Sequence, residues 1–181
     1  NITFDDTANI SAAITTGTAG GITLNGVSTV SANLTSGSGG ITLGNGAITI
    51  GGNVTMDAND GAFTQGSGGL GAGANNLNIY GDNIVLGSNF TDTGTLTVGS
   101  STSGQAIGVG TGQAGTSLTD AEVGYLSSGT WTLLAFANQA GTGTINIGTV
   151  NWSDNVSFNG GTAGDVNING VSDAGNHTFL A

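Results

Sequence analysis

The sequence predicts an all-β protein, a single-domain parallel β-helix (β-solenoid) of roughly nine short coils over residues 1–181. Three observations predict this fold. The strand signals are very short and alternate apolar with polar residues, glycine or asparagine follows almost every one, and similar segments recur 19 residues apart. Strands of about three to five residues between turns suit a coil with several corners better than the longer strands of a sandwich.

The strand signals follow one another along the whole chain. Each places β-branched or aliphatic residues at every second position, with threonine or asparagine between them, which is typical of a strand with one apolar and one polar face. In chain order these runs are 22–24, 41–43, 47–50, 54–56, 77–80, 84–86, 96–98, 145–147 and 166–168. The glycine-rich segment 66–73 interrupts the pattern, and we expect a loop there.

Two pairs of segments define the period. Residues 20–24 (Gly-Gly-Ile-Thr-Leu) recur unchanged as residues 39–43, and residues 77–79 (Leu-Asn-Ile) precede residues 96–98 (Leu-Thr-Val) by 19 positions. A period near 20 residues is typical of one turn of a β-helix. With stacked strands about 4.8 Å apart, the coils predict a rod about 40 Å long.

The segment 119–126 departs from the strand pattern. Thr119 is followed three positions later by Glu122, which is the spacing of a helix capping box. Gly124 disfavours a long helix. We therefore expect one or two helical turns at a corner, after which residues 131–137 return to a strand.

The two ends of the chain resemble each other. Residues 1–4 are similar to residues 155–158, and residues 22–28 are similar to residues 166–172. Open edge strands are normally capped or paired in natural proteins. We therefore expect copies of the chain to assemble head to tail into a homopolymer.

The composition excludes several partners. The chain has no lysine or arginine and 11 acidic residues, so its formal net charge is −11. Without cations it cannot neutralise phosphates, so we expect no nucleic-acid binding. No apolar run approaches the ~18 residues of a membrane span, so we expect no membrane insertion. Stability has to come from backbone ladders and apolar packing.

The repeats resemble the shaft of filamentous-haemagglutinin-type bacterial exoproteins and related giant adhesins. The motifs that carry the resemblance are those at 20–24 and 39–43, Gly-Gly-Asn-Val-Thr-Met at 51–56, and residues 96–100 with 118–122. The resemblance implies a right-handed β-helix at the bacterial cell surface, in an extracellular location. That family's secretion domain carries a proline-containing motif, and this chain has no proline, so the resemblance is to the repeat region.

Catalysis is not expected. The chain has one histidine (His177), one glutamate (Glu122) and no cysteine. A Ser-His-Asp triad would need His177 beside a serine and an aspartate. Polysaccharide lyases share the β-helix fold, but their chemistry relies on Lys or Arg. A carbohydrate-active enzyme therefore remains the least favoured function.

Calcium is the one metal that the sequence suggests. Asp57, Asn59 and Asp60 loosely resemble the acidic start of a calcium loop, and Asp5 and Asp6 form a second acidic pair. The bidentate glutamate of an EF-hand is missing. We expect no cofactor, with loosely bound calcium as the only candidate.

A surface adhesin module that binds host glycans or proteins is the main alternative function. It would need exposed aromatic side chains, and the candidates are Tyr80, Tyr125, Trp131 and Trp152. Burial of these rings would favour a structural role. The asparagines are expected to lie in turns or to form stacked side-chain ladders between coils, although several begin Asn-x-Ser/Thr sequons.

The sequence as a whole predicts a structural subunit or segment of a bacterial extracellular fibre, adhesin shaft or matrix filament. Because the chain begins with Asn1 rather than methionine, we expect a processed product or a piece of a larger protein.

Overall fold

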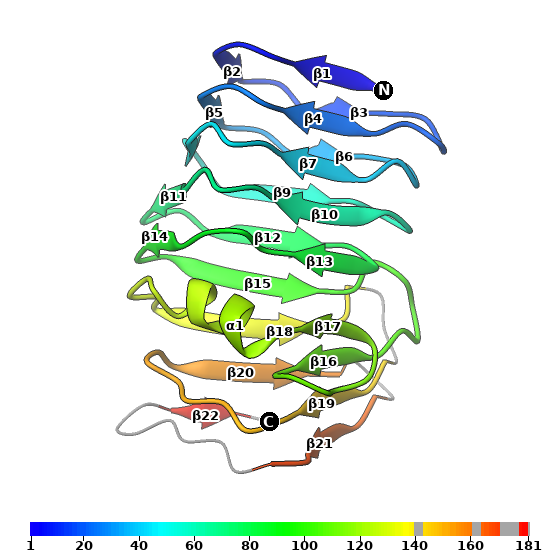
Figure 1. Ribbon diagram of the computed structural model, residues 1–181, viewed down its shortest axis with the longest axis vertical. Helices are drawn as coiled ribbons and strands as arrows, with labels where there is room; N and C mark the ends of the chain where they lie inside the picture. The colour runs from blue at the N-terminus through cyan, green and yellow to red at the C-terminus, as the bar shows by residue number, and fades with distance from the viewer. Residues whose placement is uncertain (140–142, 161–163, 171–177, 181) are drawn as a thin grey trace.

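The protein is a parallel β-solenoid with one short helix, as the sequence predicts (Figure 1). The computed structural model describes residues 1–139, 143–160, 164–170 and 178–180. Successive coils stack along one axis, so the first and last coils lie at opposite ends of the molecule.

Four parallel sheets form the walls of the solenoid. Sheet A contains β1 (Ile2–Phe4), β4 (Ile22–Leu24), β7 (Ile41–Leu43), β10 (Ala62–Gln65) and β13 (Asn83–Val85). Sheet B contains β2 (Ala8–Ile10), β5 (Ser28–Val30), β8 (Ile48–Ile50), β11 (Leu70–Gly73) and β14 (Phe90–Asp92). Sheet C contains β3 (Ile14–Thr15), β6 (Leu34–Thr35), β9 (Val54–Asp57), β12 (Leu77–Tyr80), β15 (Thr95–Gly99), β18 (Leu133–Ala137), β20 (Val156–Asn159) and β22 (Phe179–Leu180). Sheet D contains β17 (Thr116–Leu118), β16 (Ile107–Val109), β19 (Ile145–Ile147) and β21 (Val166–Ile168), and it continues the face of sheet A below β13.

The repeats found in the sequence are neighbours in the stack. Ile22, Thr23 and Leu24 of β4 pair with the matching residues of β7, and β12 pairs with β15 from Leu77↔Leu96 onward. Identical or similar side chains therefore lie above one another at most of these positions, because the period of the sequence equals the length of one coil.

The core is a set of inward-facing columns. In sheet A, one column runs through Ile2, Ile22, Ile41, Phe63 and Ile84. All of its members except Ile2 are at most 1% exposed, and Thr23 and Thr42 face outward beside them. Alternation along each strand thus produces one continuous apolar strip.

The solenoid has about eight turns rather than nine, as the eight strands of sheet C show. The difference comes from one long turn. Most coils return to the same sheet after 19 to 23 residues, but Leu96 of β15 pairs with Leu134 of β18, 38 residues later. The extra residues form β16, β17 and α1 (Asp120–Leu126).

The helix forms at the residues that the sequence predicts, but on a face of the solenoid rather than at a corner. Thr119 is its N-cap, and the Thr119 and Glu122 side chains form the complete capping box. Val123 and Leu126 are buried and anchor the helix on the core. The helix takes the place of a strand on the face of sheet B, whose last strand is β14.

Strands β16 and β17 form an unusually compact parallel pair. Parallel neighbours ordinarily need a crossover of about a dozen residues. Here residues 110–115 suffice, because each strand is only three residues long. Gly110, Gly112 and Gly115 adopt φ values of 94°, 83° and 112°, which only glycine adopts readily.

The predicted loop at 66–73 is wrong for its second half. Leu70–Gly73 forms β11, which pairs with β8 and β14. Glycine is tolerated in this strand because Leu70 and Ala72 are fully buried and fix its inward face.

Candidate functional site

The aromatic candidates do not form an open binding surface. Trp131 and Trp152 are only 4% and 5% exposed. The Trp131 indole donates to the Leu126 carbonyl oxygen at 2.7 Å, and Trp152 packs edge-on against Phe136 and Phe158 with ring centroids 5.7 Å away. Both tryptophans therefore belong to the apolar core.

The two tyrosines are partly buried. Tyr125 packs against the apolar core from α1. Burial of the Tyr80 phenol raises its pKa, and the nearby Asp57 carboxylate raises it further. The four aromatic candidates lie on separate elements and do not converge on one site.

Asp57 and Asp60 lie together at the corner that follows sheet C, and the structure adds Asp82, which the sequence reasoning missed. The Ser101 hydroxyl donates to Asp57 Oδ1 at 2.8 Å, and Gln139 Nε2 donates to Asp57 Oδ2 at 3.1 Å. The Thr102 hydroxyl lies 2.6 Å from Asp82 Oδ2 and 3.2 Å from Asp60 Oδ1. These contacts link corners from different coils, so the carboxylates serve as acceptors that join the coils.

Asn59 belongs to the same corner. It has the only positive φ of a non-glycine residue in the described chain (45°), and its amide donates to the Ser36 carbonyl oxygen of the coil before. Asp5 and Asp6 lie far away on the first coil, where Asp5 Oδ1 accepts from Asn25 Nδ2 at 2.8 Å. Within residues 1–139, 143–160, 164–170 and 178–180, no three His, Cys, Asp or Glu side chains gather as metal ligands would. His177 lies outside the described residues.

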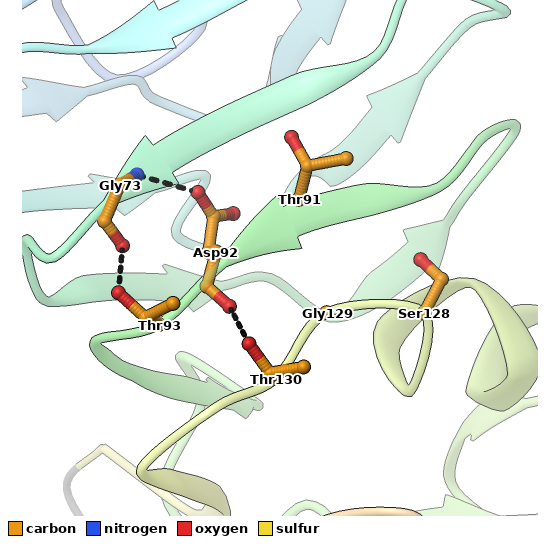
Figure 2. Close-up of a pocket in the computed structure, with 7 residues that line it drawn as sticks. All are labelled: Gly73, Thr91, Asp92, Thr93, Ser128, Gly129 and Thr130. Atoms are coloured by element: carbon orange, nitrogen blue, oxygen red, sulfur yellow. Dashed lines mark hydrogen bonds between the residues drawn. The ribbon is translucent and has the colours of Figure 1, made fainter.

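A shallow depression lies between β14 and the segment after α1, and Figure 2 shows it. Its lining residues are Gly73, Thr91, Asp92, Thr93, Ser128, Gly129 and Thr130. Asp92 Oδ1 accepts from the backbone N–H groups of Ala72 and Gly73. Burial raises the pKa of the Asp92 carboxyl to about 6, although backbone hydrogen bonds from Gly73 and Thr91 act in the opposite direction.

The segment after the helix closes the lower edge of sheet B at this depression. The Thr130 N–H donates to the Asp92 carbonyl oxygen at 2.9 Å, and the Ser128 hydroxyl donates to the Phe90 carbonyl oxygen at 2.8 Å. One backbone donor and one hydroxyl thus replace the strand that would otherwise pair with β14. The depression therefore marks the contact between β14 and the segment after α1, and polar groups of these two parts already bond to each other.

The two end coils present apolar residues that belong to the core columns. Ile2 of β1 is 36% exposed, whereas its column neighbour Ile22 is 1% exposed. Ile168 of β21 is 54% exposed, whereas its neighbour Ile147 is fully buried. The exposure arises because no strand of the described chain covers these residues on one side.

In an end strand, only alternate residues form backbone hydrogen bonds with another strand of the described chain. The Ile2 N–H donates to the Gly21 carbonyl oxygen, and the Phe4 carbonyl oxygen accepts from the Asn25 N–H. The backbone N–H and C=O groups of Ile2 and Phe4 are therefore directed toward β4. In a parallel ladder, alternate residues bond to opposite sides. Thr3 therefore directs its N–H and C=O away from β4, along an edge where no described strand lies.

Comparison of the chain with protein-family models, curated proteins and solved structures gives no match. Among the described residues, no helix has the length and apolar character needed to cross a membrane.

Proposed function

We propose that the chain is a structural rod of a bacterial extracellular fibre, adhesin shaft or matrix filament, and that copies associate end to end through their open coils. The observation that carries this proposal is the exposure of core-column residues at both ends, Ile2 on β1 and Ile168 on β21. The bacterial and extracellular setting rests on the resemblance of the repeat motifs to adhesin shafts.

The energetics support association at the ends. Burial of apolar surface contributes about 25 cal/mol per Å². Covering an end coil also pairs the unpaired backbone groups of an edge strand, which natural proteins otherwise protect. Along its sides the rod offers mostly threonine, asparagine and glycine, so the largest gain lies at the ends.

The proposal predicts filaments whose length grows with protein concentration. We expect negative-stain electron microscopy and analytical ultracentrifugation of the purified chain to show rods that are multiples of one molecule in length. Ile168→Asp should block growth, because it places a charge in the junction. Val27→Asp is the matched control, since Val27 is 57% exposed but lies at a corner along the side. Monomers at high concentration, or equal loss with both variants, would contradict the proposal.

A further inference from the structure

We infer that two copies join in one register, with β21 of one copy against β1 of the next, so that Val166 lies opposite Ile2, Asn167 opposite Thr3 and Ile168 opposite Phe4. This inference rests on the proposed end-to-end association and specifies its geometry. It follows from three properties of the described chain: the direction of the free backbone groups, the side-chain columns, and the polar pairs that flank them.

The free backbone groups of the two edges are complementary. On β21, the Asp165 carbonyl oxygen accepts from the Ile145 N–H, and the Asn169 N–H donates to the Ile147 carbonyl oxygen, so these residues face β19. By the alternation of a parallel ladder, Val166 and Ile168 direct their N–H and C=O groups toward the open end.

On the opposite edge, the alternation leaves Asn1, Thr3 and Asp5 facing outward from β1. The junction then contains the same ladder as the interior. Val166 N–H donates to the Asn1 carbonyl oxygen, Thr3 N–H to that of Val166, and Ile168 N–H to that of Thr3. The interior pair β1–β4 uses this pattern, with Ile2 and Phe4 in the places of Val166 and Ile168.

The side-chain columns select this register. Val166 continues a column whose next members, Ile145 and Ile107, are buried, and Ile168 continues the column of Ile147. A shift by one residue would turn these side chains to the outer face. A shift by two would leave one of the two apolar pairs without a partner.

The flanking polar residues also match in this register. It places Asn169 opposite Asp5 and Asp165 opposite Asn1, so each carboxylate meets an amide in a chain that has no cationic lysine or arginine. The interior already contains such a pair, because Asn25 Nδ2 donates to Asp5 Oδ1 at 2.8 Å.

The central outward pair has an interior counterpart too. The junction pairs Asn167 with Thr3 in the same order in which Asn78 pairs with Thr97. On the neighbouring face, β22 lies at the same end as β21, and β3 at the same end as β1, so sheet C can continue in the same step.

Cysteine cross-linking tests the register, because the chain has no native cysteine. The double variant Thr3→Cys/Asn167→Cys changes two exposed outward residues and places the thiols on directly opposed positions. Opposed residues of adjacent strands are about 4.8 Å apart, within the range that a disulfide spans. Oxidation should give a ladder of covalent multimers on a non-reducing gel.

Two variants calibrate the result. Thr23→Cys/Thr42→Cys sets the oxidation yield of a known opposed pair inside one chain, where Thr23 and Thr42 are in register. Thr3→Cys/Asn169→Cys offsets the pair by two residues, beyond disulfide reach, and should give less than a tenth of the multimers.

The outcomes separate the two proposals. Filaments of the unmodified chain with multimers only from the 3/167 pair support both. Filaments with preferential cross-linking of the 3/169 pair, or with no cross-linking of either pair, overturn the register and leave end-to-end association standing. An unmodified chain that stays monomeric overturns the association and the register together.

Discussion

Asp92 is an acidic residue whose ionisation is coupled to folding. It lies inward on β14 and is only 5% exposed, and its Oδ2 has no hydrogen-bond partner in the described part of the chain. Burial of the carboxyl group disfavours the charged carboxylate more than the backbone hydrogen bonds to it favour that form, which accounts for a pKa raised to about 6 from 3.8.

The raised pKa predicts a pH-dependent stability. The folded state binds the proton more tightly than the unfolded state, so the contribution of Asp92 is fully present below about pH 4 and is lost as pH rises through 6. After allowance for screening by solvent at the depression, we expect a loss of about 1 kcal/mol.

Asp92→Asn should remove this component, because the amide does not titrate. The difference in unfolding free energy between the two proteins, measured by chemical denaturation from pH 3.5 to 7.5, isolates the residue, since all other carboxyl groups are shared. A pH-independent difference would contradict the assignment.

Glu122 shows how far sequence reasoning reaches at the scale of single residues. The capping box was predictable because Thr119 and Glu122 are three positions apart. The second role of Glu122 was not, because Oε1 accepts from the Leu86 N–H at 2.9 Å, 36 residues away. Asp82 was missed at the acidic corner for the same reason, since only the stacking brings it near Asp57 and Asp60.

At the scale of elements, asparagine side chains reinforce the stack mainly through bonds to backbone N–H groups of the next coil, rather than through the side-chain ladders that the sequence predicts. Asn33 Oδ1 accepts from the Thr55 N–H, Asn53 Oδ1 from the Asn76 N–H, and Asn76 Oδ1 from the Thr95 N–H, at 2.9 to 3.1 Å. Asn155 makes the same contact with Thr178 near the last coil. Each of these asparagines directly precedes a strand of sheet C. Its side-chain oxygen therefore adds one hydrogen bond to the start of the backbone ladder.

Glycine at the coil corners permits close stacking. A Cβ atom at Gly46 would lie 2.3 Å from the carbonyl carbon of Gly26 in the coil above, which no side chain can accept without moving the backbone. At Gly17, by contrast, nothing lies within 4 Å of such an atom.

Gly46→Ala should therefore destabilise the protein by about 1–3 kcal/mol through overpacking. Gly17→Ala is the control and should leave stability unchanged or raise it by up to about 1 kcal/mol, because it restricts the unfolded chain. Urea denaturation of both variants measures the effect. Equal stability of the two would show that the corners are not closely packed.

The alternating runs predicted strands of all four sheets, because each coil resembles the one before it. In sheet B, however, they marked only β8. The β16–β17 pair has no such repeat, and its turn depends on the φ angles of three glycines, which composition alone does not specify. The strand β11 was hidden because its outward residues are glycines.

At the scale of the whole molecule, charge opposes the fold. The chain carries 11 acidic residues and no lysine or arginine, so its side chains cannot pair with a basic side chain of either kind. The hydroxyl, amide and backbone donors that bind Asp57, Asp82 and Asp92 neutralise none of this charge. Mutual repulsion of the carboxylates therefore lowers the stability of the folded chain, and dissolved salt can screen this repulsion.

We expect the melting temperature to rise with ionic strength at neutral pH. A gain of about 1 kcal/mol between low salt and 0.5 M NaCl would correspond to roughly 3 °C for a chain of this size. Differential scanning calorimetry in NaCl and in choline chloride of equal ionic strength measures it, and agreement between the two salts identifies screening. A fall in melting temperature with salt would contradict this account.

The sequence predicts one coil too many because the turns of the solenoid are not all equally long. Division of the chain by its period assumes that every turn has the same length, but the turn from β15 to β18 takes nearly twice the usual number of residues. The similarity of residues 1–4 to residues 155–158 was also misleading, because β1 lies in sheet A and β20 in sheet C.

That long turn has a mechanical consequence. The first and last described strands, β1 and β22, lie at opposite ends of the stack, so a pull applied there unfolds the coils one at a time from the outside (Figure 1). An ordinary coil then releases about 70 Å of chain, and the turn that carries the helix releases about 130 Å. Under tension the protein would lengthen in even steps, interrupted once by a step of nearly double size, which would mark the position of the helix in a force-extension trace.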